Sequence, residues 1–353
     1  MWIFLVVILL LAALLEYLSL RGGAACIDGD FSLSEKRVEI GEELTLTTAV
    51  RNTSRLPVTY CTLQLSFPLS AALPEGVNGK DDLYLRILTD LFRLWGRGSV
   101  ERSMRFSMTK RGVFLIAGRE IGRGDFLGLK TRTGRFDTRR TVIVYPERLQ
   151  SGKLTEALGN SCGELTAQRW LLRDPILPLT VREYTGSEPM HTISWTQTAR
   201  RGELTVREFD YTRSLNCRVL LSVNGLTPED EVLLDRCCGA ARTVCEHLMA
   251  AGVEAELYTN AVLTGYPNRA FRFVSAAQNR EEDLLDVLAR VGSVPCSAAG
   301  ALIDACLETQ TDAAAYVLIA PHADAEALDA LKKLNAATGG SALLVAVDAL
   351  EVD

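Results

Sequence analysis

Residues Val38–Val50 have the sequence V-E-I-G-E-E-L-T-L-T-T-A-V, and this stretch decides the fold of the first half of the chain. Apolar and polar side chains alternate on both sides of Gly41, as they do in antiparallel strands that bury one face. A glycine between two such runs is typical of a turn. The alternation recurs at Leu63, Leu65 and Phe67, at Met104, Phe106 and Met108, and at Val142 and Val144. Short strands at this spacing predict a small all-β sandwich over residues 28–148.

Upstream of this region the chain begins with an apolar run from Met1 to Leu15. A helix of about 20 residues crosses the roughly 30 Å hydrocarbon core of a bilayer, so we expect a transmembrane anchor over residues 1–21. Arg21 follows the run and no Lys or Arg precedes it, which favours a single-pass protein of the cell membrane with cytoplasmic domains. An alternative is lipidation of Cys26, because the preceding G-A-A is similar to a bacterial lipoprotein cleavage site.

Composition excludes some classes of function. The 353 residues have a net charge of −6, which argues against non-specific binding of nucleic acid. Arginine is abundant between residues 86 and 148, whereas the chain after Pro228 is acidic and rich in alanine. The nine cysteines lack the spacing of a disulfide framework, and we expect reduced thiols. With three histidines, none at ligand spacing from the cysteines, no zinc site is expected.

Residues 81–95 interrupt the strand pattern. Leu83, Ile87, Leu91 and Leu94 lie at helical spacing. One hypothesis is an amphipathic helix that rests on a bilayer or on a partner. The other is a helix or strand that caps the core of the sandwich, and core packing is the commoner outcome.

After residue 214 the pattern changes to alternating strands and helices. Residues 219–221, 316–319 and 343–347 are short continuous apolar runs, as strands covered on both faces require. Helical stretches lie between them, the first beginning at Thr227, which can cap it. This alternation predicts a doubly wound α/β domain over residues 214–353.

The two predicted domains are joined by residues 149–213, a segment dense in charges and aromatics. Its centre, Arg182–Arg200, reads R-E-Y-T-G-S-E-P-M-H-T-I-S-W-T-Q-T-A-R. This resembles R-x-Y-x-x-G-D-x-x-R-x-I-x-W-x-x-x-A-R, the signature of the DUF58 family of membrane-anchored bacterial proteins with a von Willebrand factor A-like domain. Glu188 stands where Asp is usual, and His191 where Arg is usual. The candidate interaction residues are Arg182, Tyr184, Glu188, His191, Trp195 and Arg200.

We expect most charged side chains of this joint to form contacts that hold the two domains together, with Trp195 buried between them. The planar guanidinium group of arginine binds carboxylates that are held in a fixed direction. Docking of a partner's acidic surface is a second hypothesis. His191 alone does not indicate catalysis, because no nucleophile with an orienting acid is spaced to use it.

Residues 222–226, S-V-N-G-L, follow the first predicted strand of the α/β domain. The resemblance places a metal-ion-dependent adhesion site there, with the sequence D-x-S-x-S. Ser222, Asn224 and Leu226 replace its aspartate and two serines, which makes the site degenerate. A hard divalent cation needs anionic oxygens, so we expect no metal and no cofactor.

These features predict a non-catalytic, membrane-anchored scaffold that binds other proteins. The family resemblance implies a MoxR-type AAA+ ATPase as the partner, in the assembly of a larger complex. A hydrolase that uses the charged joint is one alternative, although the chain lacks a phosphate loop and a G-x-S-x-G elbow. A lipid-anchored extracellular adhesion protein is another.

Overall fold

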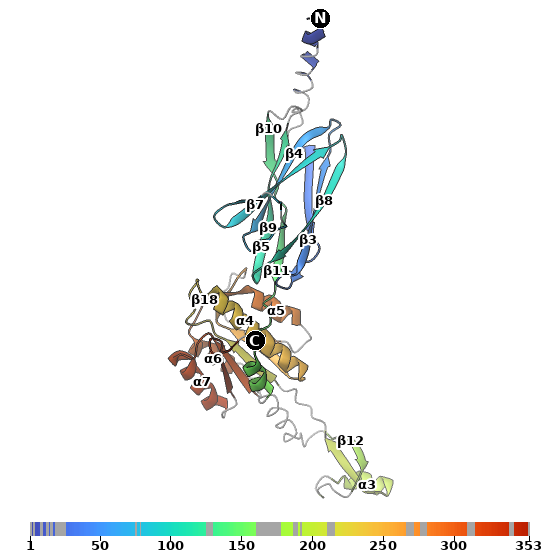
Figure 1. The fold of residues 1–353 in the computed structure, drawn as a ribbon. Coiled ribbons are helices and arrows are strands. Elements are labelled where there is room, and N and C mark those ends of the chain that lie inside the picture. The colour runs from blue at the N-terminus through green and yellow to red at the C-terminus, as the bar shows by residue number, and fades with distance from the viewer. Residues whose placement is uncertain are drawn as a thin grey trace. The chain divides into compact units, whose positions relative to one another are not determined.

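The computed structural model divides into two compact units, Met1–Glu147 and Arg148–Asp353, which are drawn in Figure 1. The described residues are 26–74, 76–77, 79–124, 130–159, 178–185, 190, 193–209, 216–265, 272–275, 281–308, 315–338 and 342–351, with 2, 4–7, 10, 11, 14 and 17 near the N-terminus. The domain boundaries predicted at residues 28, 149 and 214 stay predictions.

The first unit is built from strands. One sheet has the order β1-β3-β8-β5, and the other has the order β2-β11-β9-β4-β7-β6, with β10 also paired to β9. The strands are β1 (Ile27–Leu33), β2 (Arg37–Val38), β3 (Glu43–Asn52), β4 (Val58–Pro68), β5 (Ala71–Ala72), β6 (Gly79–Asp81), β7 (Leu85–Leu94), β8 (Ser99–Met108), β9 (Gly112–Gly124), β10 (Thr131–Arg135) and β11 (Arg139–Val144).

The two sheets enclose one apolar core. Leu44 and Leu46 of β3 are buried, whereas the threonines between and after them are mostly half-buried, as the alternation in this stretch predicts. Phe67 of β4 meets Phe106 of β8 edge to face, with ring centroids 5.5 Å apart. Because β4 and β8 belong to different sheets, this contact joins the two layers (Figure 1).

Most of residues 81–95 form strand β7, Leu85–Leu94, so the hypothesis of an amphipathic helix was wrong. β7 pairs with β4 along its length, and Leu88, Phe92 and Leu94 are buried in the core. The spacing misled because positions four apart share a face in a helix and also in a strand, whose period is two. Leu91, on the other face of β7, is 43% exposed.

The second unit mixes strands and helices. Its main sheet has the order β17-β15-β14-β19-β20, and β16 pairs with β18. Its elements are β12 (Pro178–Glu183), α3 (Trp195–Arg201), β13 (Thr205–Phe209), β14 (Asn216–Leu221), α4 (Glu231–Ala250), β15 (Glu254–Thr259), β16 (Ala261–Leu263), β17 (Arg272–Ser275), α5 (Glu281–Arg290), β18 (Val291–Pro295), α6 (Ala299–Glu308), β19 (Ala315–Ala320), α7 (Ala325–Thr338) and β20 (Ala342–Ala346).

This sheet corrects the prediction of a doubly wound, von Willebrand A-like domain. β15, β14, β19 and β20 are parallel, but β17 runs antiparallel to β15, so the sheet is mixed. A parallel pairing needs a crossover, usually a helix. The described part of the connection from β15 to β17 contains β16, and β17 runs in the opposite direction to β15. Strands also make up a larger share of the described residues than helices do.

A buried ionic group fixes α6 against the main sheet. Arg218 of β14 is 1% exposed, and its Nη1 donates to the carbonyl of Cys306 in α6 at 2.6 Å. Its Nε donates to Oε2 of Glu256 at 3.2 Å, and the Tyr258 hydroxyl donates to the same oxygen at 3.1 Å. These bonds hold the carboxyl-terminal end of α6 in place.

The expected membrane anchor also needs correction. Among the described residues, no helix is long and apolar enough to cross a membrane. The prediction of a single-pass location in the cell membrane, and of membrane contact through this helix, was therefore wrong.

Candidate functional site

Three neighbouring strands, β14, β15 and β19, run parallel and therefore end at the same edge of their sheet. Polar residues follow each end: Ser222 and Asn224 after β14, Asn260 after β15, and His322 and Asp324 after β19. Ligands of open α/β sheets bind beyond the carboxyl ends of the strands. We call this edge the strand-end site and take it as the candidate functional site.

The carboxylate of Glu326 connects the loop after β14 to the start of α6. Its Oε1 accepts a hydrogen bond from Nδ2 of Asn224 at 2.9 Å and another from the backbone N–H of Ala299 at 3.1 Å. Ala299 begins α6, so its N–H has no partner within that helix, and the positive end of the helix faces the carboxylate. Two donors from two different elements therefore hold one acidic oxygen.

The side chain of Asn260 bonds to three other residues around the site. Asn260 is fully buried, and its Oδ1 accepts the backbone N–H of Val223 at 3.0 Å. Its Nδ2 donates to the carbonyl of Ser297 at 2.8 Å and to Oδ1 of Asn224. Ser222 donates from Oγ to the same Asn224 oxygen at 3.2 Å. Every polar atom of the Asn260 side chain is thus bonded within the protein.

Little open space remains inside this network. The free volume among Ser222, Asn224, His322, Asp324 and Glu326 is about 10 Å³. That is the room of about one water molecule. Within the described part of the chain, no group of three or more His, Cys, Asp or Glu side chains is placed to hold a metal ion.

The rim of the site is acidic. Nδ1 of His322 lies 2.9 Å from Oδ2 of Asp348, the two side chains both being well exposed. Asp230 accepts bonds from the Thr227 hydroxyl at 2.7 Å and the Thr227 N–H at 2.9 Å, and these bonds hold its pKa below the usual range. Gly225, at φ +82°, brings the loop close to His322 without a side chain between them.

The strand-end site brings Ser222 and Asn224 together, the two residues that the sequence assigned to a degenerate metal loop. Asn260 and Glu326 were not predicted from the sequence. Asn260 directly follows the apolar end of β15, and Glu326 lies in the first turn of α7. These are the positions from which a side chain reaches the carboxyl edge of a sheet.

The joint residues fall partly within the described structure. Glu188 and His191 lie outside the described residues, and for Arg182 only the backbone, in β12, is described. Trp195 begins α3 and is 62% exposed, and Arg200 lies exposed in the last turn of that helix.

The prediction of a buried Trp195 was therefore wrong. Ile193 is instead a buried apolar residue of this segment, since it is 5% exposed and forms a bridge with Val206 of β13. The backbone of the joint is held by bonds from the Tyr184 N–H to the Leu204 carbonyl and from the Ser194 N–H to the Thr205 carbonyl.

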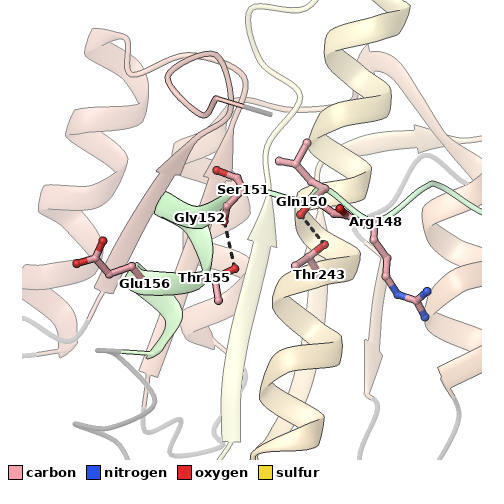
Figure 2. A pocket seen from close by; sticks show the side chains of 8 residues that line it. Arg148, Gln150, Ser151, Gly152, Thr155, Glu156 and Thr243 are labelled. Carbon is pink, nitrogen blue, oxygen red and sulfur yellow. Dashed lines mark hydrogen bonds between the residues drawn. The ribbon is translucent and has the colours of Figure 1, made fainter. Parts of the chain in front are cut away.

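An open pocket of about 570 Å³ lies where Arg148 and the residues after it cross α4 (Figure 2). The Thr243 hydroxyl donates to the Leu149 carbonyl at 3.3 Å, and the Ser151 hydroxyl is buried. Figure 2 shows Arg148 pointing away from Ser151, and its Nε bonds to Glu246 at 2.6 Å. The polar groups of this pocket fasten the chain to α4 and do not converge on one position for a ligand.

Comparisons with known proteins are distant. No family model matches the chain. Over 191 residues it is 23% identical to the uncharacterized protein YeaD of Bacillus subtilis, a match that covers 54% of this chain and 46% of that protein. The chain therefore spans less than half the length of this relative.

Solved structures resemble about a third of the chain. A cohesin module from a Clostridium perfringens family 33 glycoside hydrolase covers 33% of this chain and 96% of its own, at 11% identity and a TM-score of 0.26. A CARDB domain from Pyrococcus furiosus covers 33% and 93%, at 10% identity and a TM-score of 0.24. A type II cohesin domain of Acetivibrio cellulolyticus covers 33% and 94%, also at 10% identity and a TM-score of 0.24.

Proposed function

We propose that the protein is a non-catalytic scaffold that works by binding other proteins. The observation that carries this proposal is the bonding of Glu326, whose Oε1 already accepts from Asn224 and from the Ala299 N–H. A general base needs a lone pair directed at the substrate, and a hard cation needs anionic oxygens. A ligand of Oε1 would have to compete with the protein's own donors, and the bonds from Asn224 and Ala299 hold the loop in one shape.

The joint supports a binding role as well. Trp195 and Arg200 are exposed on α3, and Tyr184, which follows β12, is half-buried. Trp, Tyr and Arg are the residue types that contribute most often to binding energy at protein interfaces. Their place in a segment that resembles the DUF58 signature extends the proposal to the partner of that family, a MoxR-type AAA+ ATPase.

The absence of metal chemistry is tested by titrating the full chain with Mn²⁺ and observing bound ion by electron paramagnetic resonance. We expect no binding up to ~1 mM, a concentration at which weak protein sites for hard cations already fill. Asn224→Asp is the matched variant, because it places a second carboxylate beside Glu326 and should gain weak binding. Strong binding by the unchanged protein would contradict the proposal.

The partner is tested by cross-linking the purified full chain with a MoxR-type ATPase, with and without nucleotide. We expect a complex in at least one nucleotide state, and we expect Trp195→Ala combined with Arg200→Ala to weaken it. The matched control is Val232→Ala, which changes an exposed apolar side chain on α4. If no complex forms in either state, the ATPase is not the partner.

A further inference from the structure

Three strands of the first unit meet at one of its ends. β4 begins there and β7 ends there, since Val58 pairs with Leu94, and β9 ends there, since Cys61 pairs with Arg123. The loop before β4 and the turn after β7 therefore lie together. We call this region the Trp95 end, and it comprises Arg55, Leu56, Tyr60, Leu91, Arg93, Trp95 and Arg97.

Large apolar side chains are exposed at the Trp95 end. Trp95 is 82% exposed, Leu91 43%, and Leu56 and Tyr60 38% each. A single exposed apolar side chain is ordinary, but a group of them at one place marks a contact surface.

The backbone beneath these side chains is fixed. Asn52 is fully buried, and its Nδ2 donates to the carbonyl of Leu56 at 2.8 Å and to that of Trp95 at 3.0 Å. The N–H of Arg97 donates to the Ser54 carbonyl at 2.8 Å. One buried amide thus positions both apolar side chains, and a partner would bind without having to order these loops.

The charge at this end is positive and not neutralised. Arg55, Arg93 and Arg97 are exposed, and within the described structure none of the three forms an ion pair. Arg86, near the start of the same strand β7, is by contrast bonded through Nε to Asp81 at 2.6 Å.

The opposite end of β7 provides an internal comparison. Leu83 is 78% exposed and Tyr84 77%, so apolar side chains also project there. Their neighbours in the chain include Asp81 and Asp82, and the nearby Arg86 is paired with Asp81. The two ends of β7 therefore present similar apolar groups, one beside arginines that are unpaired within the described residues and the other beside acidic residues and a paired arginine.

We infer that the Trp95 end docks an acidic segment of a partner protein, one in which carboxylates flank a large apolar side chain. This inference rests on the proposed function and names the chemistry of the partner. Unpaired guanidinium groups bind carboxylates through two parallel hydrogen bonds, and Trp and Tyr supply the apolar contact.

The probe is a short fluorescent peptide in which Asp and Glu flank a Leu-Phe pair, measured by fluorescence anisotropy with the full chain. We expect binding that weakens as salt is added, because the arginines are exposed. Trp95→Ala and Arg97→Glu should each weaken it by about tenfold, the loss of one strong interface contact. The matched control Tyr84→Ala, at the other end of β7, should leave it unchanged.

Three results would overturn the inference. They are equal binding of a peptide with Lys in place of every Asp and Glu, no effect of Trp95→Ala, and binding of vesicles of anionic lipid through Trp95 without binding of the acidic peptide. Each of these can be obtained while the proposed scaffold function stands. Conversely, if Trp95→Ala loses the peptide but the ATPase complex never forms, the Trp95 end is supported and the proposed partner is wrong.

Discussion

At the carboxyl ends of β14, β15 and β19, polar side chains bond to one another, whereas at the end of β7 the side chains project into solvent without ion pairs among the described residues. The charges of the two units differ as well. Residues 1–147 contain 20 Lys and Arg against 16 Asp and Glu, and residues 148–353 contain 18 against 28. The comparison teaches that polar side chains alone do not mark a binding site. Their hydrogen-bonding groups must also be free to bond a ligand or a partner.

The largest effect is expected from opening the bonded network with Asn260→Ala. The N–H of Val223, the carbonyl of Ser297 and Oδ1 of Asn224 each lose a partner inside the protein. Because each unsatisfied buried group costs about 1–3 kcal/mol, we expect a loss of about 3–5 kcal/mol in the free energy of unfolding of the second unit. Denaturant titration followed by hydrogen exchange measures it.

The control for this variant is Asn335→Ala, which removes one bond, that from the Ala342 N–H, at a half-buried position. It should cost about 1 kcal/mol. If the two variants lose equal free energies of unfolding, the strand-end site is no more strongly bonded than an ordinary helix surface. The contrast between the two units would then fail.

The next effect concerns the Trp95 end, through Gly96→Ala. A Cβ on Gly96 would collide with the backbone carbonyl of Arg55, and neither loop can retreat without breaking the bonds of Asn52. We expect a loss of about 2–3 kcal/mol in the first unit, the cost of forcing atoms into a packed position. Gly300→Ala in α6 is the control, because nothing lies near the added methyl group, and it should be neutral or stabilising.

How far the sequence predicted the fold depended on the range of the interactions. The strand around Leu44 and Leu46 was predictable because its two-residue alternation is local. β7 was not, because its spacing fits both periods and only pairing with β4 decides between them. The antiparallel direction of β17 could not be predicted either. It depends on which neighbouring strand β17 pairs with, and no local sequence pattern specifies that pairing.

A smaller effect is expected from Glu246→Gln on α4. Burial raises the pKa of Glu246, but hydrogen bonds from Arg148 and Arg242 outweigh it and hold the pKa below its usual range. Arg242 is 2% exposed and bonds to Oε1 at 2.7 Å. Replacing the charged acceptor should cost about 1.5–2 kcal/mol in thermal or denaturant unfolding at neutral pH.

The pH dependence gives this variant a second test. A carboxyl whose folded pKa lies below its unfolded value stabilises the fold at neutral pH, and that stability is lost as the pH falls from 4.5 toward the folded value. The free energy of unfolding of Glu246→Gln should not show this loss as the pH falls below 4.5. Glu156→Gln, on the exposed surface nearby, is the control and should leave the profile unchanged.

The candidate site was predictable only in part. Ser222 and Asn224 were found because they follow the first apolar run after residue 214, but Asn260 and Glu326 lie 36 and 102 positions from Asn224 and meet it only in the folded sheet. Trp195 was also predicted to be buried. It lies on a seven-residue helix without buried residues, whereas Ile193, two positions earlier, is buried.

The smallest effect is expected from Trp95→Ala on stability, and it separates binding from folding. Trp95 is 82% exposed, so its removal should change the free energy of unfolding by no more than about 0.5 kcal/mol. Phe92, three residues earlier in strand β7, is 1% exposed, and Phe92→Ala should cost about 3–5 kcal/mol in the same measurement. If the two variants cost the same, Trp95 is part of the core, and a loss of peptide binding in Trp95→Ala would report misfolding instead of a lost contact. Equal stability of Trp95→Ala and the unchanged protein makes any loss of binding a property of the surface.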